Sequence, residues 1–553
     1  MPIGVYVCHC GLNIAGILNM GDLKSFAEKL PDVVVARELQ FSCSDIGQEQ
    51  IQKDIAEFKL DRVVVAACSP RLHEPTFRRA ISKAGLNPYM LEMANIREQC
   101  SWVHMDQPAM ATQKAKDLIR MAVAKAALLI PLELESIPVS QDVLVVGGGV
   151  AGIAAALDLA DAGLHVYLVE RRPTIGGYMA LLTDVFPTND CSICVLGPKM
   201  SEVFNHPNIT LITYAEVLGI EGSVGNFSVT GHRRARFVDE KLCKGCISEC
   251  AAVCPVEVPN EYDFGIGKRK AIYVPYPQAV PLAACVDPNA CIGCTRCVEA
   301  CPADAVKLEQ TPQEFKINVG AIIVATGWRP FDATRKEEYG FGRYRDVITT
   351  LQMERMLNAS GPTKGEVVRP STGEIAKSIA FLQCVGSRDA TVGNIYCSRI
   401  CCMASLKNAQ LVKEKYPDTK VTIYYIDIRA CGEGYEEFYV RAQKLGINFV
   451  RARVSRIDEV DADIFATFED TQTGEFNRVR YDMVVLSVGL EPDEKAEVLG
   501  NLLGLSRRSD GFFEIAHPKM RPVEAHIDGV FIAGRSEERR VGKECRSRWS
   551  PYH

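Results

Sequence analysis

Residues 141–177 read QDVLVVGGGVAGIAAALDLADAGLHVYLVERRPTIGG, and this stretch decides the fold. An apolar run predicts a buried strand, and an alanine-rich helix and a second strand ending at Glu170 follow the glycine turn. In the G-x-G-x-x-G pattern the glycines permit a tight turn, close approach to a pyrophosphate, and close packing of helix on strand. The pattern predicts a dinucleotide-binding α/β domain whose turn is Gly147, Gly148, Gly149 and Gly152, with Glu170 placed for a ribose hydroxyl.

Two later segments favour FAD over NAD as the dinucleotide. The glycine pair Gly176–Gly177 follows Glu170, and the strand-like run 320–327 ends in Ala325, Thr326 and Gly327. Both segments resemble those of flavoproteins with two dinucleotide-binding domains, of the thioredoxin reductase kind. The resemblance implies that the acid, the glycine pair and the Ala-Thr-Gly segment surround FAD.

The composition is that of a globular protein of several domains. The chain has 553 residues, of which 47% are hydrophobic and 24% are charged. The net charge is −6, which gives no support for a nucleic-acid or an anionic membrane partner. We found no apolar run long enough for a membrane span and no secretory signal at the start, so we expect a cytoplasmic protein.

Eight regularly spaced cysteines occupy residues 237–313, inside the flavin domain. They form C-x2-C-x3-C-x3-C-P and then C-x2-C-x2-C-x3-C-P, and the second run is the bacterial ferredoxin signature. A zinc site needs a longer gap between ligand pairs, so two [4Fe–4S] clusters are favoured over zinc. The fourth cysteine of each run binds the cluster of the other run. We therefore expect one cluster to be bound by Cys243, Cys246, Cys250 and Cys301, and the other by Cys291, Cys294, Cys297 and Cys254.

A second α/β unit begins near residue 378, where a reductase of this architecture would bind NAD(P)H. The loop after its first strand, CVGSRDATVGNIYCSRICC, has no glycine fingerprint. Asp427 keeps the position of a ribose-binding acid, although a strand-end capping residue is an equal interpretation. The loop and the following helical segment hold four cysteines, with Cys397 expected one turn before the last two. They could bind a cluster, remain buried thiols or form a redox dithiol: Cys384, Cys397, Cys401 and Cys402.

The chain resembles the A subunit of heterodisulfide reductase. The resemblance rests on VCHCGLNIAG at 7–16, ACSPRLHEPTF at 67–77, PTNDCSICVLGPKM at 187–200, the glycine fingerprint, the inserted ferredoxin and the C-x12-C-x3-C-C set. It implies an oxidoreductase component with FAD and several [4Fe–4S] clusters, in which the second-unit cysteines bind a further cluster.

The same resemblance implies a multi-subunit complex. Its members would be the B and C subunits of heterodisulfide reductase, a hydrogenase or formate dehydrogenase module, and ferredoxin. The flavin would bifurcate electron pairs between ferredoxin and the disulfide of coenzymes M and B, or an analogue of it. The rival hypotheses are a self-contained NAD(P)H-dependent disulfide or ferredoxin reductase and a non-catalytic redox scaffold.

Other cysteines have less specific patterns. Cys191 and Cys194 form C-x-x-C, which fits a flavin-linked dithiol as well as it fits cluster ligation or a packed pair. The cysteines of the first unit follow no spacing signature, so buried thiols are favoured over a cluster there. They are Cys8, Cys10, Cys43 and Cys68.

These patterns predict an α/β protein with an ordered series of domains. We expect an N-terminal α/β domain at 1–137, an FAD domain at 141–236 and 314–377 with its return at 496–534, the ferredoxin insert at 237–313, and a second Rossmann-like domain at 378–495. The basic stretch 535–553, which includes Cys545, is expected to be a vector-derived tail without a role.

Overall fold

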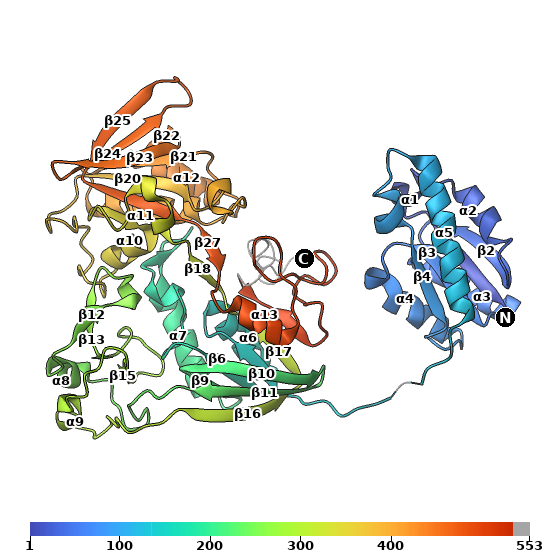
Figure 1. The fold of residues 1–553 in the computed structure, drawn as a ribbon, viewed down its shortest axis with the longest axis horizontal. Helices are drawn as coiled ribbons and strands as arrows, with labels where there is room; N and C mark the ends of the chain where they lie inside the picture. The colour runs from blue at the N-terminus through green and yellow to red at the C-terminus, as the bar shows by residue number, and fades with distance from the viewer. Residues whose placement is uncertain (134, 535–553) are drawn as a thin grey trace. The chain divides into compact units, whose positions relative to one another are not determined.

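The computed structural model describes residues 1–133 and 135–534, so the basic stretch with Cys545 lies outside the described residues. The chain divides into two compact units, Met1–Ile137 and Pro138–His553. Figure 1 draws the chain from blue at its start to red at its end.

The first unit is a four-stranded parallel sheet in the order β2-β1-β3-β4. One face packs on helices α2 and α5 and the other on α3 and α4, and the alternating residues of the strands fill both cores. The strands are β1 (Ile3–Cys8), β2 (Val33–Leu39), β3 (Arg62–Ala67) and β4 (Leu91–Asn95). The helices are α2 (Met20–Ala27), α3 (Asp45–Phe58), α4 (Pro70–Lys83) and α5 (Pro108–Ala127).

The glycine-rich stretch forms the centre of a five-stranded parallel sheet in the order β28-β17-β5-β6-β9. Helices α6 (Val150–Asp161) and α7 (Ser192–Asn205) cover one face, and α13 (Ala496–Leu503) and a three-stranded antiparallel sheet cover the other. The parallel strands are β5 (Val143–Val146), β6 (Val166–Glu170), β9 (Ile209–Thr213), β17 (Ala321–Val324) and β28 (Val530–Ile532). The antiparallel strands are β10 (Ala215–Ser223), β11 (Asn226–Arg233) and β16 (Gln313–Val319).

The same plan is repeated between residues 347 and 488. A parallel sheet, β19-β26-β20-β21-β22, carries helices on one face and an antiparallel sheet on the other. The parallel strands are β19 (Val347–Thr349), β26 (Met483–Val488), β20 (Ser378–Val385), β21 (Lys420–Tyr425) and β22 (Asn448–Arg451). The covering elements are α10 (Thr350–Leu357), α11 (Cys401–Lys415), α12 (Tyr435–Lys444), β23 (Val454–Val460), β24 (Asp463–Glu469) and β25 (Phe476–Tyr481). Two such units confirm the expected thioredoxin-reductase-like fold.

The cysteine-rich insert is built from short elements, green in Figure 1, around a small core. They are α8 (Ile247–Ala252), β12 (Glu257–Pro259), β13 (Lys268–Lys270), β14 (Ile272–Tyr273), β15 (Cys285–Val286) and α9 (Arg296–Glu299). The Tyr276 hydroxyl donates to the carbonyl oxygen of Ile175 in the flavin unit. Arg355 of α10 donates to Asp263 at 2.9 Å. The insert is therefore attached to both nucleotide-type units.

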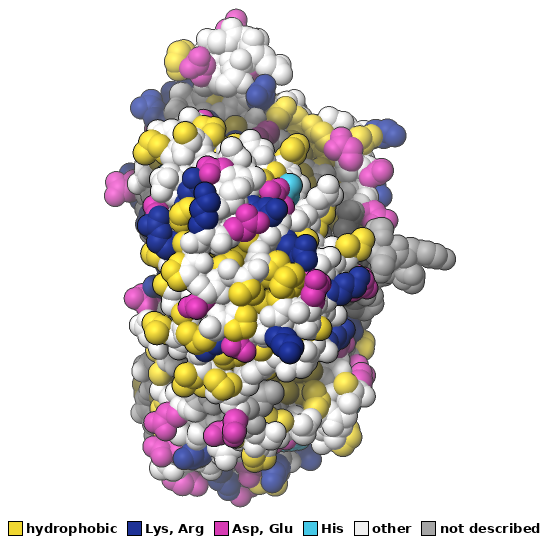
Figure 2. Space-filling view, turned by 90° about the vertical axis from the view of Figure 1, so that its right-hand side faces the viewer, with side chains coloured by type: hydrophobic (Ala, Val, Ile, Leu, Met, Phe, Trp, Pro, Cys, Tyr) yellow, Lys and Arg dark blue, Asp and Glu magenta, His cyan; other side chains and the backbone are white. Residues whose placement is uncertain are grey.

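The surface reflects the near balance of charges in the sequence. Figure 2 shows Lys and Arg side chains interspersed with Asp and Glu over one face of the molecule. Of the helices in the described ranges, none combines the length and apolar character that a bilayer crossing requires.

A buried ion pair of the second nucleotide-type unit is also hydrogen-bonded to the flavin unit. Lys407 of α11 donates to both carboxylate oxygens of Glu354 at 2.5 Å and to the carbonyl oxygen of Asp184 at 2.9 Å. The two side chains are only 2% and 3% exposed. The backbone N–H of Thr183 also donates to Glu354, at 3.2 Å.

We predict that Lys407→Met lowers the free energy of unfolding by about 3–5 kcal/mol, because Glu354 would keep a buried charge without its partner. Urea unfolding followed by circular dichroism measures the change. The exposed Lys444 on α12 of the same unit supplies the control, and Lys444→Met should cost about 0.5 kcal/mol or less. Adding Glu354→Gln to Lys407→Met should recover part of the loss, and a loss of the same size in all three variants would contradict the prediction.

Candidate functional site

The glycine turn lies at the carboxyl edge of the flavin-unit sheet. Gly147 follows β5 with a φ of +111°, and a Cβ there would overlap the carbonyl group of Ala325 at the end of β17. A Cβ on Gly152 would overlap the carbonyl oxygen of Gly147. Helix α6 starts at Val150 with Gly149 as its N-cap and no side-chain cap, so its first N–H groups are available to an anion.

Glu170 ends the neighbouring strand β6, and its side chain is buried beside the turn. Its carboxylate accepts from the backbone N–H of Gly148 and from that of Arg172, each at 2.7 Å. Each carboxylate oxygen keeps a second acceptor site, which fits a ribose hydroxyl. A Cβ on Gly177 would lie 3.1 Å from the Cα of Gly149, so the glycine pair packs directly on the turn.

The Ala-Thr-Gly segment completes this edge of the sheet. The backbone N–H of Ala325 donates to Val146 at 2.8 Å, and Thr326 and Gly327 lead into β18 (Trp328–Pro330). The Trp328 ring stacks on Tyr178, with centroids 4.5 Å apart, just after the glycine pair. Gly176 has a φ of +113°. Glycines thus line a cradle that any side chain would fill, and these residues fit FAD.

The first predicted set of insert cysteines lines one pocket, although its members come from opposite ends of the insert. Backbone N–H groups point at two of the sulfurs: that of Ala284 at Cys243, 3.4 Å away, and that of Ala305 at Cys301, 3.3 Å away. Burial raises the pKa of the Cys250 thiol to about 11. The set is Cys243, Cys246, Cys250 and Cys301.

The second predicted set lines a second pocket. The backbone N–H of Gly293 donates to Cys291 at 3.4 Å, and burial raises the pKa of the Cys297 thiol. The set is Cys254, Cys291, Cys294 and Cys297. Among the described residues, no three His, Cys, Asp or Glu side chains converge closely enough for one metal ion, and the cysteines of each set instead surround a space.

The four cysteines of the second nucleotide-type unit gather where β20 ends and α11 begins. Cys384 has a φ of +62° at a register shift between β20 and β26, which turns it out of the sheet. Cys401 and Cys402 are the first residues of α11. Cys397 lies in the irregular loop before the helix, so the predicted position one helical turn earlier is wrong, because the helix does not reach it.

Contacts to these sulfurs come from the end of β26 and from the loop before α11. Cys401 Sγ donates to the carbonyl oxygen of Val488 at the end of β26, at 3.7 Å. The backbone N–H of Arg399 donates to Cys397 Sγ at 3.4 Å. Burial, followed by repulsion from the other three thiolates, raises the pKa of Cys401 well above that of an ordinary thiol. Such thiols lose their protons readily only when they bind a metal ion.

The structure also gathers four cysteines in the first unit, which spacing did not predict. Each lies at or after the carboxyl end of a parallel strand, and these ends share one edge. The backbone N–H of Ser42 donates to Cys8 at 3.4 Å, and Arg97 donates to Cys10 at 3.1 Å. Burial raises the pKa of Cys68 to about 12, and thiolates at Cys10 and Cys43 add to the rise. The position of each cysteine near a strand end was the only signal in the sequence.

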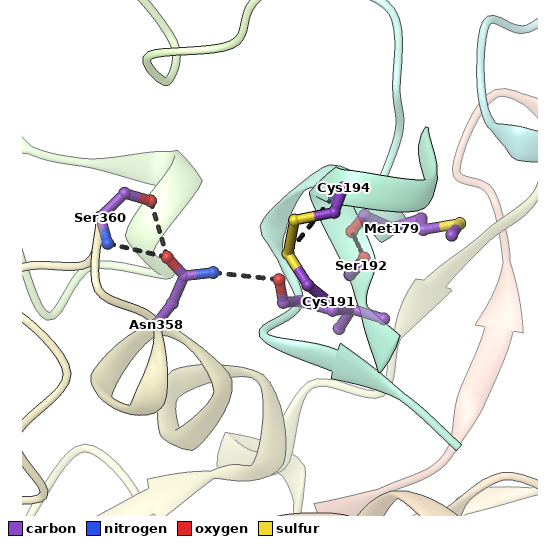
Figure 3. Close-up of a disulfide and its surroundings, with 7 residues drawn as sticks. Met179, Cys191, Ser192, Cys194, Asn358 and Ser360 are labelled. Atoms are coloured by element: carbon purple, nitrogen blue, oxygen red, sulfur yellow. Dashed lines mark hydrogen bonds between the residues drawn. A yellow bond between two sulfur atoms is a disulfide. The ribbon is translucent and has the colours of Figure 1, made fainter. Parts of the chain in front are cut away.

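Cys191 and Cys194 are joined by a disulfide at the start of α7 (Figure 3). Cys191 is the N-cap residue, and the backbone N–H of Cys194 donates to its sulfur at 3.4 Å. The Ser192 hydroxyl between them donates to the carbonyl oxygen of Met179, next to the glycine pair. The oxidised pair thus sits on the flavin unit, and its redox activity stays a prediction.

Two families match segments of the chain. Residues 142–187, which hold the fingerprint, Glu170 and the glycine pair, match the family described as FAD dependent oxidoreductase. Residues 286–306, which hold the second cysteine run of the insert, match the family described as 4Fe-4S binding domain.

Relatives match nearly the whole chain. The A subunit of the ferredoxin/F(420)H(2)-dependent CoB-CoM heterodisulfide reductase of Methanosarcina acetivorans is 61% identical over 97% of this chain and 68% of its own. The chain belongs to the family of heterodisulfide reductase A subunits. The A subunit of the H(2):CoB-CoM heterodisulfide,ferredoxin reductase of Methanothermobacter marburgensis is 57% identical over 96% of this chain and 81% of its own. The A subunit of the H(2)/formate:CoB-CoM heterodisulfide,ferredoxin reductase of Methanococcus maripaludis is 50% identical over 96% of this chain and 81% of its own.

As a member of this heterodisulfide reductase family, the chain is an oxidoreductase that uses FAD and iron–sulfur clusters to transfer electrons. The glycine cradle and the cysteine sets are the parts of the chain that could hold these groups.

Gly149 offers a test of the FAD site that spares the fold. A Cβ on Gly149 would meet no protein atom within 4 Å, so Gly149→Ala should fold, yet its methyl would stand where the pyrophosphate approaches. We predict that flavin binding weakens about tenfold or more, equal to about 1.4 kcal/mol or more, so that less flavin stays bound. The flavin-to-protein absorbance ratio after anaerobic purification measures it. Gly197→Ala, equally open but inside α7, is the control and should retain flavin.

We predict that Cys401→Ser combined with Cys402→Ser removes about four irons per chain, because one [4Fe–4S] cluster would lose two ligands. Iron and acid-labile sulfide are measured on anaerobically purified protein. Cys431→Ser, which changes an exposed thiol in a nearby loop, should leave both unchanged. Unchanged iron in the double variant would show that these cysteines hold no cluster.

Proposed function

We propose that this chain is the flavin subunit of a heterodisulfide reductase-type complex and the site where electron pairs are bifurcated. In this proposal one electron of each pair goes to ferredoxin and the other goes toward a disulfide, that of coenzymes M and B or an analogue. The names of the relatives, which join a heterodisulfide to ferredoxin, hydrogen, formate or F(420)H(2), support it.

The observation that carries the proposal is the loop after β20. In a flavin-dependent reductase of this fold the nucleotide turn of the second unit admits NAD(P)H. Here the equivalent strand end carries Cys384, and the helix that would face a pyrophosphate opens with Cys401 and Cys402. The proposal is that electrons enter or leave by a cluster at this edge, so the chain exchanges them with protein partners and not with a nicotinamide.

The remaining residues would then hold the other centres. The cradle of Gly147, Gly149 and Gly152 binds FAD, which when bound can take up a pair of electrons and pass them on singly. The two insert sets hold two [4Fe–4S] clusters, and the first-unit cysteines are candidates for another. Backbone N–H groups aimed at the sulfurs favour the anionic thiolate that each cluster requires.

The proposed partners are the B and C subunits, a hydrogenase or formate dehydrogenase module, and ferredoxin. Lys407 and Glu354 keep the second nucleotide-type unit against the flavin unit, and the Tyr276 and Arg355 contacts keep the insert against both. Such contacts suit electron transfer, because its rate depends on the distances between the centres and these contacts keep the distances constant.

We predict that NADH and NADPH leave the flavin absorbance of the anaerobic protein unchanged, whereas reduced ferredoxin bleaches it. The cause is that the described loop after β20 carries no G-x-G-x-x-G fingerprint. Stopped-flow absorbance measures both reactions. Rapid bleaching by NADH would favour the self-contained reductase. A flavin that no donor reduces would favour the scaffold, and the Gly149→Ala protein supplies the blank.

A further inference from the structure

Asp427 follows β21 at the place where a nucleotide-binding domain keeps its ribose acid, but its carboxylate is occupied. Its Oδ1 accepts from Nη1 of Arg388 at 2.6 Å and from Nε of Arg429 at 3.3 Å. Arg388 belongs to the loop after β20, and Arg429 lies two residues beyond Asp427. One carboxylate oxygen therefore holds two guanidinium groups from two strand-end loops.

The same three residues are tied to the second-unit cysteines. Cys402 Sγ donates to the carbonyl oxygen of Asp427 at 3.7 Å. Arg388 has a φ of +55°, and its backbone N–H donates to the carbonyl oxygen of Tyr396 at 2.8 Å, which folds the loop back beside Cys397. Asp427 thus contacts the cysteine group through its backbone and the arginines through its side chain.

The electrostatic interactions agree with this placement. Burial raises the pKa of the Cys384 thiol, and the positive charge of Arg388 opposes that rise. The bond to Asp427 raises the pKa of Arg429, and the thiolates of Cys397 and Cys402 add to the rise. Arg453 also acts on Cys384, but its guanidinium donates to Asp389 at 2.7 Å and so belongs to another ion pair.

We propose that Asp427 clamps Arg388 and Arg429 beside the Cys384, Cys397, Cys401 and Cys402 group, so that their two positive charges favour the reduced state of the cluster held there. The inference rests on the proposed function, since it takes these cysteines as ligands. The three residues are positioning residues. Asp427, which stands at the position of a ribose-binding acid, thus holds two arginines whose charges act on the cluster.

The physical reason is the charge that accompanies reduction. Each electron that reaches the site from the flavin or a partner adds one negative charge and breaks no bond. A guanidinium stays protonated throughout, so it stabilises the more negative state at any working pH. Arg388 and Arg429 are 24% and 43% exposed, so solvent screens them, and each should change the reduction equilibrium by about two- to fivefold.

The first test substitutes the arginines. Anaerobic protein is titrated with dithionite and followed by EPR, and the component that is missing from the Cys401→Ser, Cys402→Ser protein identifies the site. Arg388→Gln and Arg429→Gln should each move the half-reduction point of that component to lower potential, with iron content unchanged. Arg456→Gln is the control, because its exposed guanidinium pairs with Asp458 on β23, and it should not move the point.

The second test substitutes the anchor in two backgrounds. Loss of a nearby negative charge alone would ease reduction, whereas release of two clamped arginines would hinder it. Asp427→Asn should therefore lower the half-reduction potential in the otherwise unchanged protein. It should raise the potential in protein that already carries Arg388→Gln and Arg429→Gln. The same rise in both backgrounds would overturn the clamp.

The outcomes separate this inference from the function on which it rests. If the Cys401→Ser, Cys402→Ser protein keeps every EPR component and all its iron, the proposed cluster itself is wrong. If that protein loses one component but the arginine variants leave its potential unchanged, the cluster stands and the clamp is wrong.

Discussion

The carboxyl ends of neighbouring parallel strands must meet at one edge of their sheet, and every candidate site in a nucleotide-type unit of this chain depends on that constraint. In the flavin unit, β5, β6 and β17 deliver Gly147, Glu170 and Ala325 to the same edge. No long side chain is needed to bring these groups together, because the hydrogen-bonded register of the strands already does so. The close backbone approach then leaves room only for glycine at positions 147 and 152.

The corresponding edge of the second unit carries different residues. Strands β20, β21 and β26 bring together Cys384, the carbonyl oxygen of Asp427 and that of Val488, and helix α11 adds two cysteines at its first turn. The backbone plan of a nucleotide-binding domain is kept while the residues that would contact a nucleotide are replaced. Fold and function are separable here because the sheet supplies only the edge, and the loops supply the chemistry.

Rigid connections between the parts complete the arrangement. The buried Lys407–Glu354 pair crosses from α11 to α10 and also holds the segment of the flavin unit near Asp184. A buried ion pair of this kind is weak evidence for stability, but breaking it is costly, so it acts as a specific connection. The insert is fixed by separate bonds from Tyr276 and Arg355. Together these contacts keep the flavin edge, the insert and the second-unit cysteines in one framework.

The sequence by itself determined what short spacing encodes. The 141–177 pattern predicted the strand, turn, helix and acid, and the two cysteine runs predicted which cysteines would share a pocket. Both are local patterns in which a few residues impose one geometry.

Only the tertiary structure decided which distant residues meet. Cys8, Cys10, Cys43 and Cys68 gather because β2, β1 and β3 lie side by side, and strand order is a property of the whole sheet. The sequence likewise left Asp427 as either a ribose-binding acid or a strand-end cap. Only the placement of the loops after β20 and β21 showed that its carboxylate accepts from Arg388 and Arg429. The physical reason is that burial and register are settled over the whole core, whereas a motif records only its own neighbours along the chain.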